Sequence, residues 1–458
     1  MSAKTTSKRS ATIPPAAQRP DVRLRPPSLR KNFAWTLTGN GTYVACQAGW
    51  LIVFAKLGSP AMLGQFAIGL AVCAPIVMFT RLQIRDIQAT DARDEYRFGD
   101  YLWLRLTSTV IGIVVIAAIA VLAGYNRGDA LALLAIAFFR GVESVSDVIY
   151  GLLQKWERFD LVSRSLMIKG PASLVALGVM LYFTKSVALG AVGIMVSWFA
   201  LMLFYDAPNA RRLMHAQGIT EDLRPGSIWS SGRMPIIRKL VWLALPLGIV
   251  ALLDSLNQNT PRYAIQHYLG DASLGYYAAM ASAVVAGNMV VSALANSAQP
   301  RLSRSYIYDL PAFMRLAWKL VQFGVVLGGG AVIVALLFGR PLLAFFYTPE
   351  FARNADVFVW IMVAAGLGYI ARFLVYTMTA ARYLKAQAPL YASALAAISV
   401  LSWWLVPIHG LLGAAWAICV GMTVLVLGAL AVNIHAVRTR SAAVAAEQLQ
   451  PSLPTDWA

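Results

Sequence analysis

Five basic side chains fall inside long apolar stretches of this 458-residue sequence, where charge is otherwise rare: Arg105, Arg140, Lys169, Arg262 and Arg372. An ionisable group at membrane depth costs at least about 2.5 kcal/mol on insertion scales, so it usually faces a cavity or a charged partner. Guanidinium groups donate paired hydrogen bonds whose geometry matches phosphate oxygens. These residues therefore favour recognition of an anionic, phosphate-bearing group within the membrane.

Depth separates the five groups. Arg105 and Lys169 lie close enough to the predicted inner boundary for their side chains to snorkel to water, which is the simpler interpretation of both. Arg372 is deeper, and snorkelling explains it less well.

Arg140, Glu143 and Asp147 follow one another at i, i+3 and i+7, which places them on one face of a helix. One interpretation is an arginine–glutamate pair that joins helices. The other is a polar cavity wall where a carboxylate exchanges a proton or binds Na⁺. The sequence leaves both open.

A polar run interrupts the apolar pattern between Asp254 and Arg262 and includes Asn257 and Pro261. Proline removes a backbone donor and leaves a carbonyl free one turn earlier, so we expect a kink or local unwinding. Irregular backbone at membrane depth is tolerated only beside a cavity or within protein. We prefer a substrate-facing site that includes Asp254 and Asn257; a simple kink is the alternative.

Asn40, Tyr43 and Gln47 form a polar stripe that either lines a cavity or bonds a neighbouring helix. Residues 33–80 contain no acidic side chain, which argues against a cation site in the first span. The three cysteines lie in apolar blocks and the four histidines are scattered, so we expect no metal site and no cofactor. Coupling to H⁺ or Na⁺ stays open.

The elements that must position these residues are membrane-spanning helices. The chain is 59% hydrophobic and 13% charged, whereas soluble domains carry about 25% charge. Twelve apolar stretches are long enough to cross about 30 Å of hydrocarbon as helices, which predicts an all-α integral membrane protein. They are 33–56, 61–84, 101–124, 130–153, 162–184, 186–205, 239–266, 272–299, 313–338, 355–380, 389–407 and 410–435.

The formal net charge of +18 is explained by topology rather than by nucleic acid. Most of the 39 basic residues fall in alternate loops and in the two ends of the chain. The positive-inside rule places that side, with both termini, in the cytoplasm. We therefore predict a multi-pass protein of the bacterial cytoplasmic (inner) membrane, in contact with membrane lipids and with no nucleic-acid partner.

Short echoes indicate an internal duplication. Residues 57–66 read LGSPAMLGQF and 269–277 read LGDASLGYY, and a Leu-Gly-Ala run occurs at both 189–191 and 412–414. Two six-span halves of equal orientation would be related by a pseudo-two-fold axis along the membrane normal, as in transporters that alternate access between lobes. The predicted divisions are a disordered basic cytoplasmic tail at 1–31, a first lobe at 32–206, a linker at 207–237, a second lobe at 238–436 and a cytoplasmic tail at 437–458.

Six stretches resemble the Wzx-type polysaccharide and O-antigen flippases of the MOP superfamily, to which MATE exporters also belong. They are 39–76, 81–106, 150–160, 259–280, 293–306 and 410–417. The resemblance implies a MATE-like fold and movement of an undecaprenyl-diphosphate-linked oligosaccharide from the inner to the outer leaflet, for exopolysaccharide, capsule or O-antigen (lipopolysaccharide) synthesis. It also implies a polysaccharide polymerase and export machinery as partners.

With such a substrate, we expect Arg140, Arg262 and Arg372 to contact the pyrophosphate headgroup and Arg105 to assist its uptake. The alternative is a cation-coupled, MATE-like exporter of small molecules. An enzyme is not expected, because the predicted outer loops are short and carry no nucleophile or acid–base pair. No GxxxxGK[ST] motif for ATP occurs.

Overall fold

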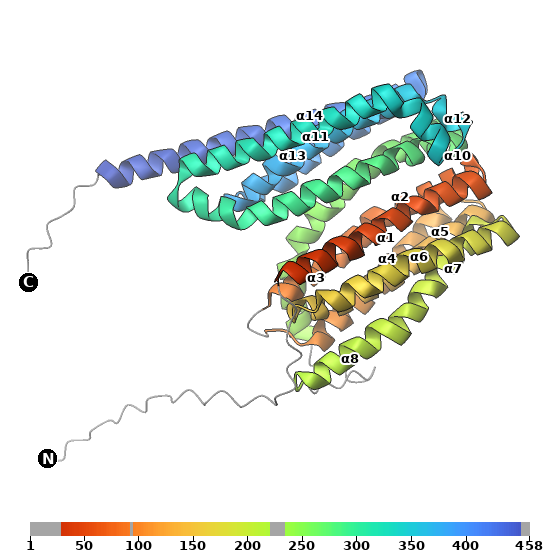
Figure 1. Ribbon diagram of the computed structural model, residues 1–458, viewed down its shortest axis with the longest axis horizontal. Coiled ribbons are helices and arrows are strands. Elements are labelled where there is room, and N and C mark those ends of the chain that lie inside the picture. The colour runs from red at the N-terminus through yellow and green to blue at the C-terminus, as the bar shows by residue number, and fades with distance from the viewer. Residues whose placement is uncertain (1–28, 92–94, 220–233, 450–458) are drawn as a thin grey trace, which may run out of the picture.

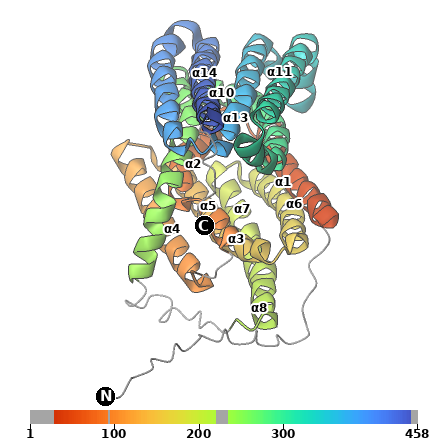
Figure 2. The same cartoon turned by 90° about the vertical axis from the view of Figure 1, so that its left-hand side faces the viewer.

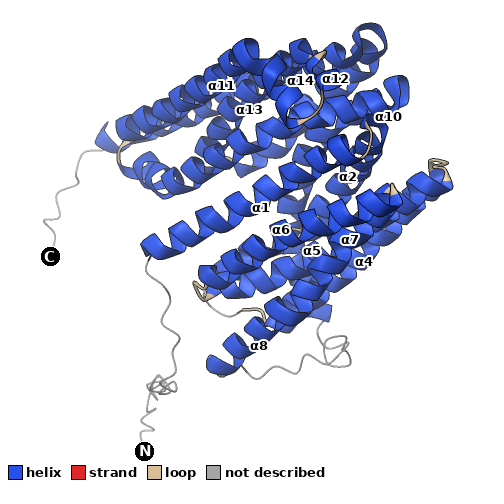
Figure 3. Cartoon of the chain, turned by 45° about the vertical axis from the view of Figure 1, so that its right-hand side comes forward, coloured by secondary structure: helices blue, strands red, loops and turns tan. Residues whose placement is uncertain are grey.

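The computed structural model describes residues 29–91, 95–219 and 234–449. All regular secondary structure within these ranges is helical (Figure 3), which confirms the all-α prediction. Nearly all of the predicted N-terminal tail, the centre of the predicted linker and the last nine residues lie outside the described residues.

The first half of the chain forms a bundle whose final span continues through a π-helix, η1, into α8. Its elements are α1 Leu29–Leu57, α2 Pro60–Arg81, α3 Ile84–Thr90, α4 Phe98–Leu122, α5 Arg127–Lys155, α6 Phe159–Thr184, α7 Val187–Leu201, η1 Met202–Asp206 and α8 Ala207–Ala216. The second half contains α10 Met234–Tyr308, α11 Leu310–Phe346, α12 Pro349–Ala352, α13 Ala355–Ala380, η3 Leu384–Ala386 and α14 Gln387–Leu449.

Eight helices in the described ranges are long and apolar enough to cross a membrane. Two of them, α10 and α14, are each a pair of helices joined at Gly270 and Gly410, where positive φ angles of 78° and 59° suit glycine. The more polar α1 and α5 have 29 residues each, which is also sufficient length. Helices therefore occupy all twelve of the predicted spanning stretches. The number of these helices that cross the membrane stays a prediction.

In Figure 2 the two halves lie one above the other. The first part of α10, before Gly270, packs against helices of both halves. It runs antiparallel to α2, and the Tyr263 hydroxyl donates to the Ala71 carbonyl at 2.6 Å. On its other side, the Asn257 amide donates to the Tyr391 carbonyl of α14 at 3.1 Å. In Figure 1 the helices of both halves extend from the side where α1 begins and α14 ends to the side that carries α12.

The glycines of the repeated LG motifs explain how closely α2 and α10 approach. A Cβ on Gly64 would overlap the Asp271 carbonyl oxygen, and a Cβ on Gly275 would overlap the Pro60 carbonyl oxygen. Gly64 and Gly275 are the second glycines of the two echoes, so equivalent positions of the repeat face each other here. A backbone-to-backbone crossing of this kind requires residues without side chains.

An aromatic cluster forms the core of the first half. Trp50 is 3% exposed, and its ring centre lies 5.8–6.3 Å from those of Phe66, Phe139 and Trp198. These side chains come from α1, α2, α5 and α7, so one cluster joins four helices. Such pairs add about 0.5–1.5 kcal/mol beyond the area that they bury.

The prediction of local unwinding at Pro261 is wrong, because within α10 the backbone departs from helical dihedral angles at Gly270 instead. Side chains donate to backbone carbonyls in the turn before the proline. Asn259 Nδ2 donates to the Ser255 carbonyl at 2.7 Å, and Thr260 Oγ1 donates to the Leu256 carbonyl at 2.8 Å. Neighbouring side chains of this kind allow a helix to accommodate proline within a membrane.

Candidate functional site

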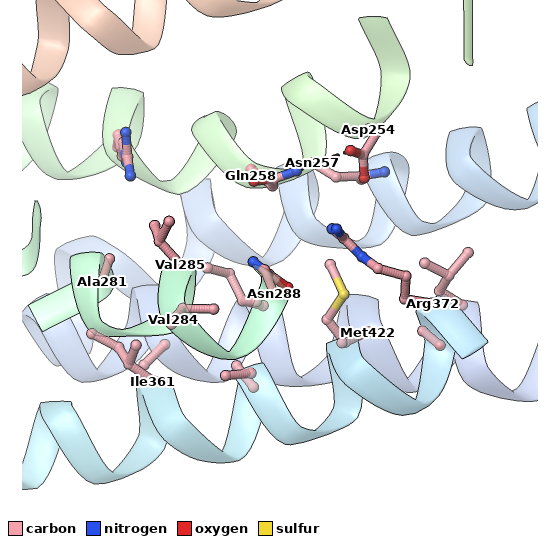
Figure 4. A pocket seen from close by; sticks show the side chains of 18 of the residues that line it. Asp254, Asn257, Gln258, Ala281, Val284, Val285, Asn288, Ile361, Arg372 and Met422 are labelled. Carbon is pink, nitrogen blue, oxygen red and sulfur yellow. Dashed lines mark hydrogen bonds between the residues drawn. The ribbon is translucent and has the colours of Figure 1, made fainter. Parts of the chain in front are cut away.

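A cavity of about 170 Å³ lies within the second half, between the two parts of α10 and helices α13 and α14 (Figure 4). Four of the predicted site residues line it together: Asp254, Asn257, Arg262 and Arg372. The remaining wall is mostly apolar. A cavity with a few convergent polar groups on an apolar wall is typical of ligand sites.

Asp254 and Arg372 face one another across this cavity. The guanidinium of Arg372 extends from α13 toward the turn of α10 that carries Asp254 and Asn257 (Figure 4). Gln258 Nε2 donates to Asp254 Oδ2 at 3.0 Å, and Arg372 Nη1 donates to Ser292 Oγ at 3.4 Å. Both charged side chains are thus held beside the cavity by neutral polar neighbours.

Arg262 provides a second guanidinium on the same wall, about 12 Å along the helix from Asp254. Its Nη1 donates to Asn259 Oδ1 at 3.2 Å, while its Nε is buried without a hydrogen-bond partner. The Oδ1 of Asn257 is also buried without a partner. Buried polar atoms are almost always satisfied, so these two indicate a place for a ligand or for water.

Three polar lining residues were not predicted from the sequence: Tyr277, Asn288 and Tyr391. Asn288 could have been identified as a candidate from the sequence, because it is an isolated amide within the apolar stretch 278–291. The tyrosines carried none, since aromatic residues are common in spans and at their ends.

The structure places Arg140 and Glu143 in the first half, away from this cavity. Arg140 Nη1 lies 2.6 Å from Glu143 Oε2, and Arg81 Nη2 lies 3.0 Å from the same oxygen. The Tyr43 hydroxyl donates to Glu143 Oε1 at 3.1 Å. Arg140 and Glu143 thus pair within α5, while the contacts of Glu143 with Arg81 and Tyr43 connect α5 to α2 and α1.

The other two residues of the first-span stripe make less specific contacts. Asn40 Nδ2 donates to the Thr36 carbonyl of its own helix at 2.9 Å, and Gln47 is half-buried. Neither lines the cavity of the second half.

The snorkelling interpretation of Arg105 and Lys169 is wrong, because the two side chains are 1% and 2% exposed. Arg105 Nη2 lies 3.5 Å from Asp147 Oδ2, and Arg85 Nη1 lies 3.2 Å from the other oxygen of that carboxylate. Lys169 Nζ lies 3.2 Å from Asp206 Oδ2. Both groups meet carboxylates inside the bundle rather than water at its surface.

Within the described residues, no cluster of three or more His, Cys, Asp or Glu side chains could hold a metal ion.

Comparison with known proteins gives a family. Residues 29–306 match the family described as polysaccharide biosynthesis protein. The capsular polysaccharide biosynthesis protein CapF of Staphylococcus aureus is 24% identical over 397 residues, which cover 86% of this chain and 96% of CapF.

Solved structures give the fold. A mutant of the MATE transporter VcmN from Vibrio cholerae has a TM-score of 0.60 at 14% identity, covering 90% of this chain and 96% of VcmN. The inward-facing conformation of a multidrug resistance MATE family transporter of the MOP superfamily has a TM-score of 0.62 at 13% identity. That match covers 89% of this chain and 94% of the transporter. The fold is therefore that of a multi-pass membrane transporter.

Proposed function

Because the chain belongs to the polysaccharide biosynthesis protein family, we propose that it is a Wzx-type flippase. Its substrate would be an undecaprenyl-diphosphate-linked oligosaccharide, moved from the inner to the outer leaflet of the cytoplasmic membrane. The observation that carries the proposal is the pair of guanidinium groups, Arg262 and Arg372, in a cavity within the membrane-spanning bundle. The capsular role in the name of the Staphylococcus relative supports a glycan substrate.

The cavity suits the diphosphate rather than the lipid tail. Phosphate oxygens accept paired hydrogen bonds from guanidinium groups, and such charge-assisted bonds are stronger where water is excluded. Arg372 faces Asp254, and Arg262 lies about 12 Å further along α10, with the amides of Asn257 and Asn288 also in the lining. Two positive charges at this spacing would lower the barrier to moving the headgroup between leaflets as the halves alternate access.

Replacing Arg262 or Arg372 with glutamine is expected to reduce glycan export at least about tenfold, since a hydrogen bond to a charged group contributes about 1.5–3 kcal/mol. Lysine at either position should restore export only in part, because an ammonium cannot donate the paired bonds. The assay is complementation of a flippase-deficient strain, with surface glycan and expression quantified. Arg340→Gln, at an exposed site outside the cavity, is the matched control. Full export by both glutamine variants at normal expression would contradict the proposal.

A specific observation keeps the cation-coupled exporter as a second candidate. Glu143 and Asp147 are each held by two guanidinium groups, whereas Asp254 has a neutral partner, Gln258. We therefore propose Asp254 as the carboxylate of the cavity best placed to take a proton or Na⁺. Deleting the gene separates the functions: accumulated lipid-linked intermediates indicate a flippase, and altered drug sensitivity with unchanged glycans indicates the exporter.

Asp254→Asn tests coupling directly. If a cation binds at Asp254, transport by the asparagine variant in proteoliposomes should lose its dependence on an imposed H⁺ or Na⁺ gradient. Asp254→Glu, which keeps the charge, is the control and should retain that dependence. A variant that follows the gradient as the parent protein does would exclude Asp254 as the coupling group.

A further inference from the structure

The side chain of Asn257 brings an unpaired hydrogen-bond acceptor to the cavity of the second half. Asn257 lines this cavity and is 1% exposed, and its Nδ2 donates to the Tyr391 carbonyl at 3.1 Å. Its Oδ1 is buried and has no hydrogen-bond partner among the described residues. An amide oxygen can accept two hydrogen bonds, so this atom lacks both of the partners that it could have.

The packing of α10 against α14 determines which atom of the amide is free. The Tyr391 carbonyl can only accept a hydrogen bond, so the nitrogen of Asn257 must face it. Turning the amide over would bring two acceptors together and leave the nitrogen without a partner. The atom that still needs a partner is therefore the oxygen, and the partner must be a donor.

Another buried amide shows how an asparagine with a purely structural role is bonded in this chain. Asn433 of α14 is 9% exposed, and its Nδ2 donates to the Leu374 carbonyl at 3.0 Å. The Thr377 hydroxyl donates to the Oδ1 of the same amide at 2.8 Å. Asn433 thus uses both ends of its amide within the protein, whereas Asn257 leaves its oxygen unpaired. A buried acceptor without a donor is unfavourable unless a ligand or water supplies one.

An ionised phosphate cannot supply that hydrogen bond. Its oxygens only accept, so they suit the donors of the cavity, Arg262 and Arg372. Beside Asn257 Oδ1, a phosphate oxygen would place two acceptors together. Asp254 is a further acceptor of the cavity, but it already accepts from Gln258 Nε2. The cavity thus offers donors to an anion and, at Asn257, an acceptor to a donor group.

One small ligand can reach both kinds of group. Asn257 and Arg262 are five residues apart on α10, or about 7.5 Å along its axis, and both line the cavity. Arg262 Nε is itself buried without a hydrogen-bond partner. A sugar joined to a diphosphate carries hydroxyl groups next to its phosphate oxygens, so it combines an anion with donors. A cation at Asn257 is disfavoured, because the guanidinium of Arg372 extends toward the same turn of α10 (Figure 4).

We propose that Asn257 Oδ1 accepts a hydrogen bond from a hydroxyl or N–H group of the sugar next to the diphosphate, and so makes the cavity selective for glycan-loaded lipid. That this lipid is the transported substrate rests on the proposed function. A lipid diphosphate without its sugar would leave the acceptor unpaired, and sites built to bind a donor group reject ligands that lack it. Transport would then be confined to carriers that bear a glycan.

The test measures the Kd of methyl diphosphate and of glucose 1-diphosphate by calorimetry on the purified full-length protein in detergent. At about pH 8 the phosphates of both monoesters are ionised and carry equal charge, and only the glucose ester has hydrogen-bond donors. The wild type should bind glucose 1-diphosphate about tenfold more tightly than methyl diphosphate. Asn257→Leu should raise the Kd of glucose 1-diphosphate about tenfold and leave methyl diphosphate bound at least as tightly as before.

Asn433→Leu is the matched control, because it removes a buried amide of the same kind that does not line the cavity. This variant should keep the preference for the glucose ester even where its Tm falls. Equal affinity of the wild type for the two probes, a result that requires no variant, would overturn the inference. An equal loss of affinity for both probes in Asn257→Leu would also overturn it, since that is the effect of a purely structural role.

Replacing Na⁺ with choline in the same titrations separates a hydroxyl donor from a cation. The preference for the glucose ester should be the same in both salts, and a preference that requires Na⁺ would overturn the inference in favour of a cation held by Asn257. Binding of neither probe would overturn the proposed function and this inference with it. Binding of both probes with equal affinity would overturn the inference alone.

Discussion

Replacing Lys169 with methionine is expected to lower the free energy of unfolding by about 3–5 kcal/mol, the range measured when one partner of a buried ion pair is removed. Asp206 is 1% exposed, and its Oδ2 lies 3.2 Å from Lys169 Nζ and accepts from the Tyr150 hydroxyl at 3.4 Å. Its Oδ1 has no hydrogen-bond partner. Without the ammonium group, a buried carboxylate would keep one weak donor.

A second substitution distinguishes the ion pair from simple packing. Lys169→Met/Asp206→Leu removes both charges, and a buried pair replaced by apolar residues is often neutral or stabilising. The Tyr150 hydroxyl keeps its 2.8 Å bond to Ser165 in this variant. Thermal melting in detergent should therefore show a large loss for the single variant and recovery in the double variant. A single variant as stable as the wild type, or a double variant as unstable as the single one, would contradict this account.

The contact of Lys169 with Asp206 could not be predicted from the sequence. Hydropathy gives the position of a residue along a span, and the apolar stretches predicted the helices well because their length and composition are enough to define them. Hydropathy does not give the direction in which a side chain points around the helix axis. The partner of Lys169 lies 37 residues away, in the π-helix η1, whose register the apolar pattern does not reveal.

Part of the candidate site could be predicted, because polar residues within an apolar stretch are recognisable in the sequence. Asp254, Asn257 and Arg262 stand out because they break an apolar pattern, and the structure brings them together with Arg372 in one cavity. The sequence does not single out Arg81, because this residue lies at a span boundary where the positive-inside rule explains its charge. The left-handed turn at Leu82 directs it inward instead.

The two halves therefore hold their arginines differently. In the first half Arg105 and Arg140 each meet a carboxylate. In the second half Arg262 and Arg372 meet neutral partners, Asn259 and Ser292. An arginine held by a neutral group keeps its charge available to a ligand, since no ion pair has to be broken first. This difference supports a transport site in the second half.

Placing alanine at Gly64 is expected to destabilise the crossing of α2 and α10 by about 1–3 kcal/mol, the usual cost of overpacking. The added Cβ would overlap the backbone oxygen of Asp271, which cannot move without displacing the whole helix. Gly275→Ala should act in the same way through the Pro60 carbonyl oxygen. If the two halves alternate access, separation at this crossing would shift the population of conformers toward those open at this end.

Spin labels at Lys56 and Ala272, both exposed at this end of the bundle, would report the separation as a longer or broader distance distribution. The matched control is Gly329→Ala on α11, where a Cβ would meet no atom within 4 Å. Since alanine is favoured over glycine within a helix by about 0.5–1 kcal/mol, the control should be neutral or slightly stabilising. A Gly64→Ala protein that keeps the stability and label distance of the wild type would show that the crossing opens at little cost. The glycines would then not determine which end of the transporter is closed.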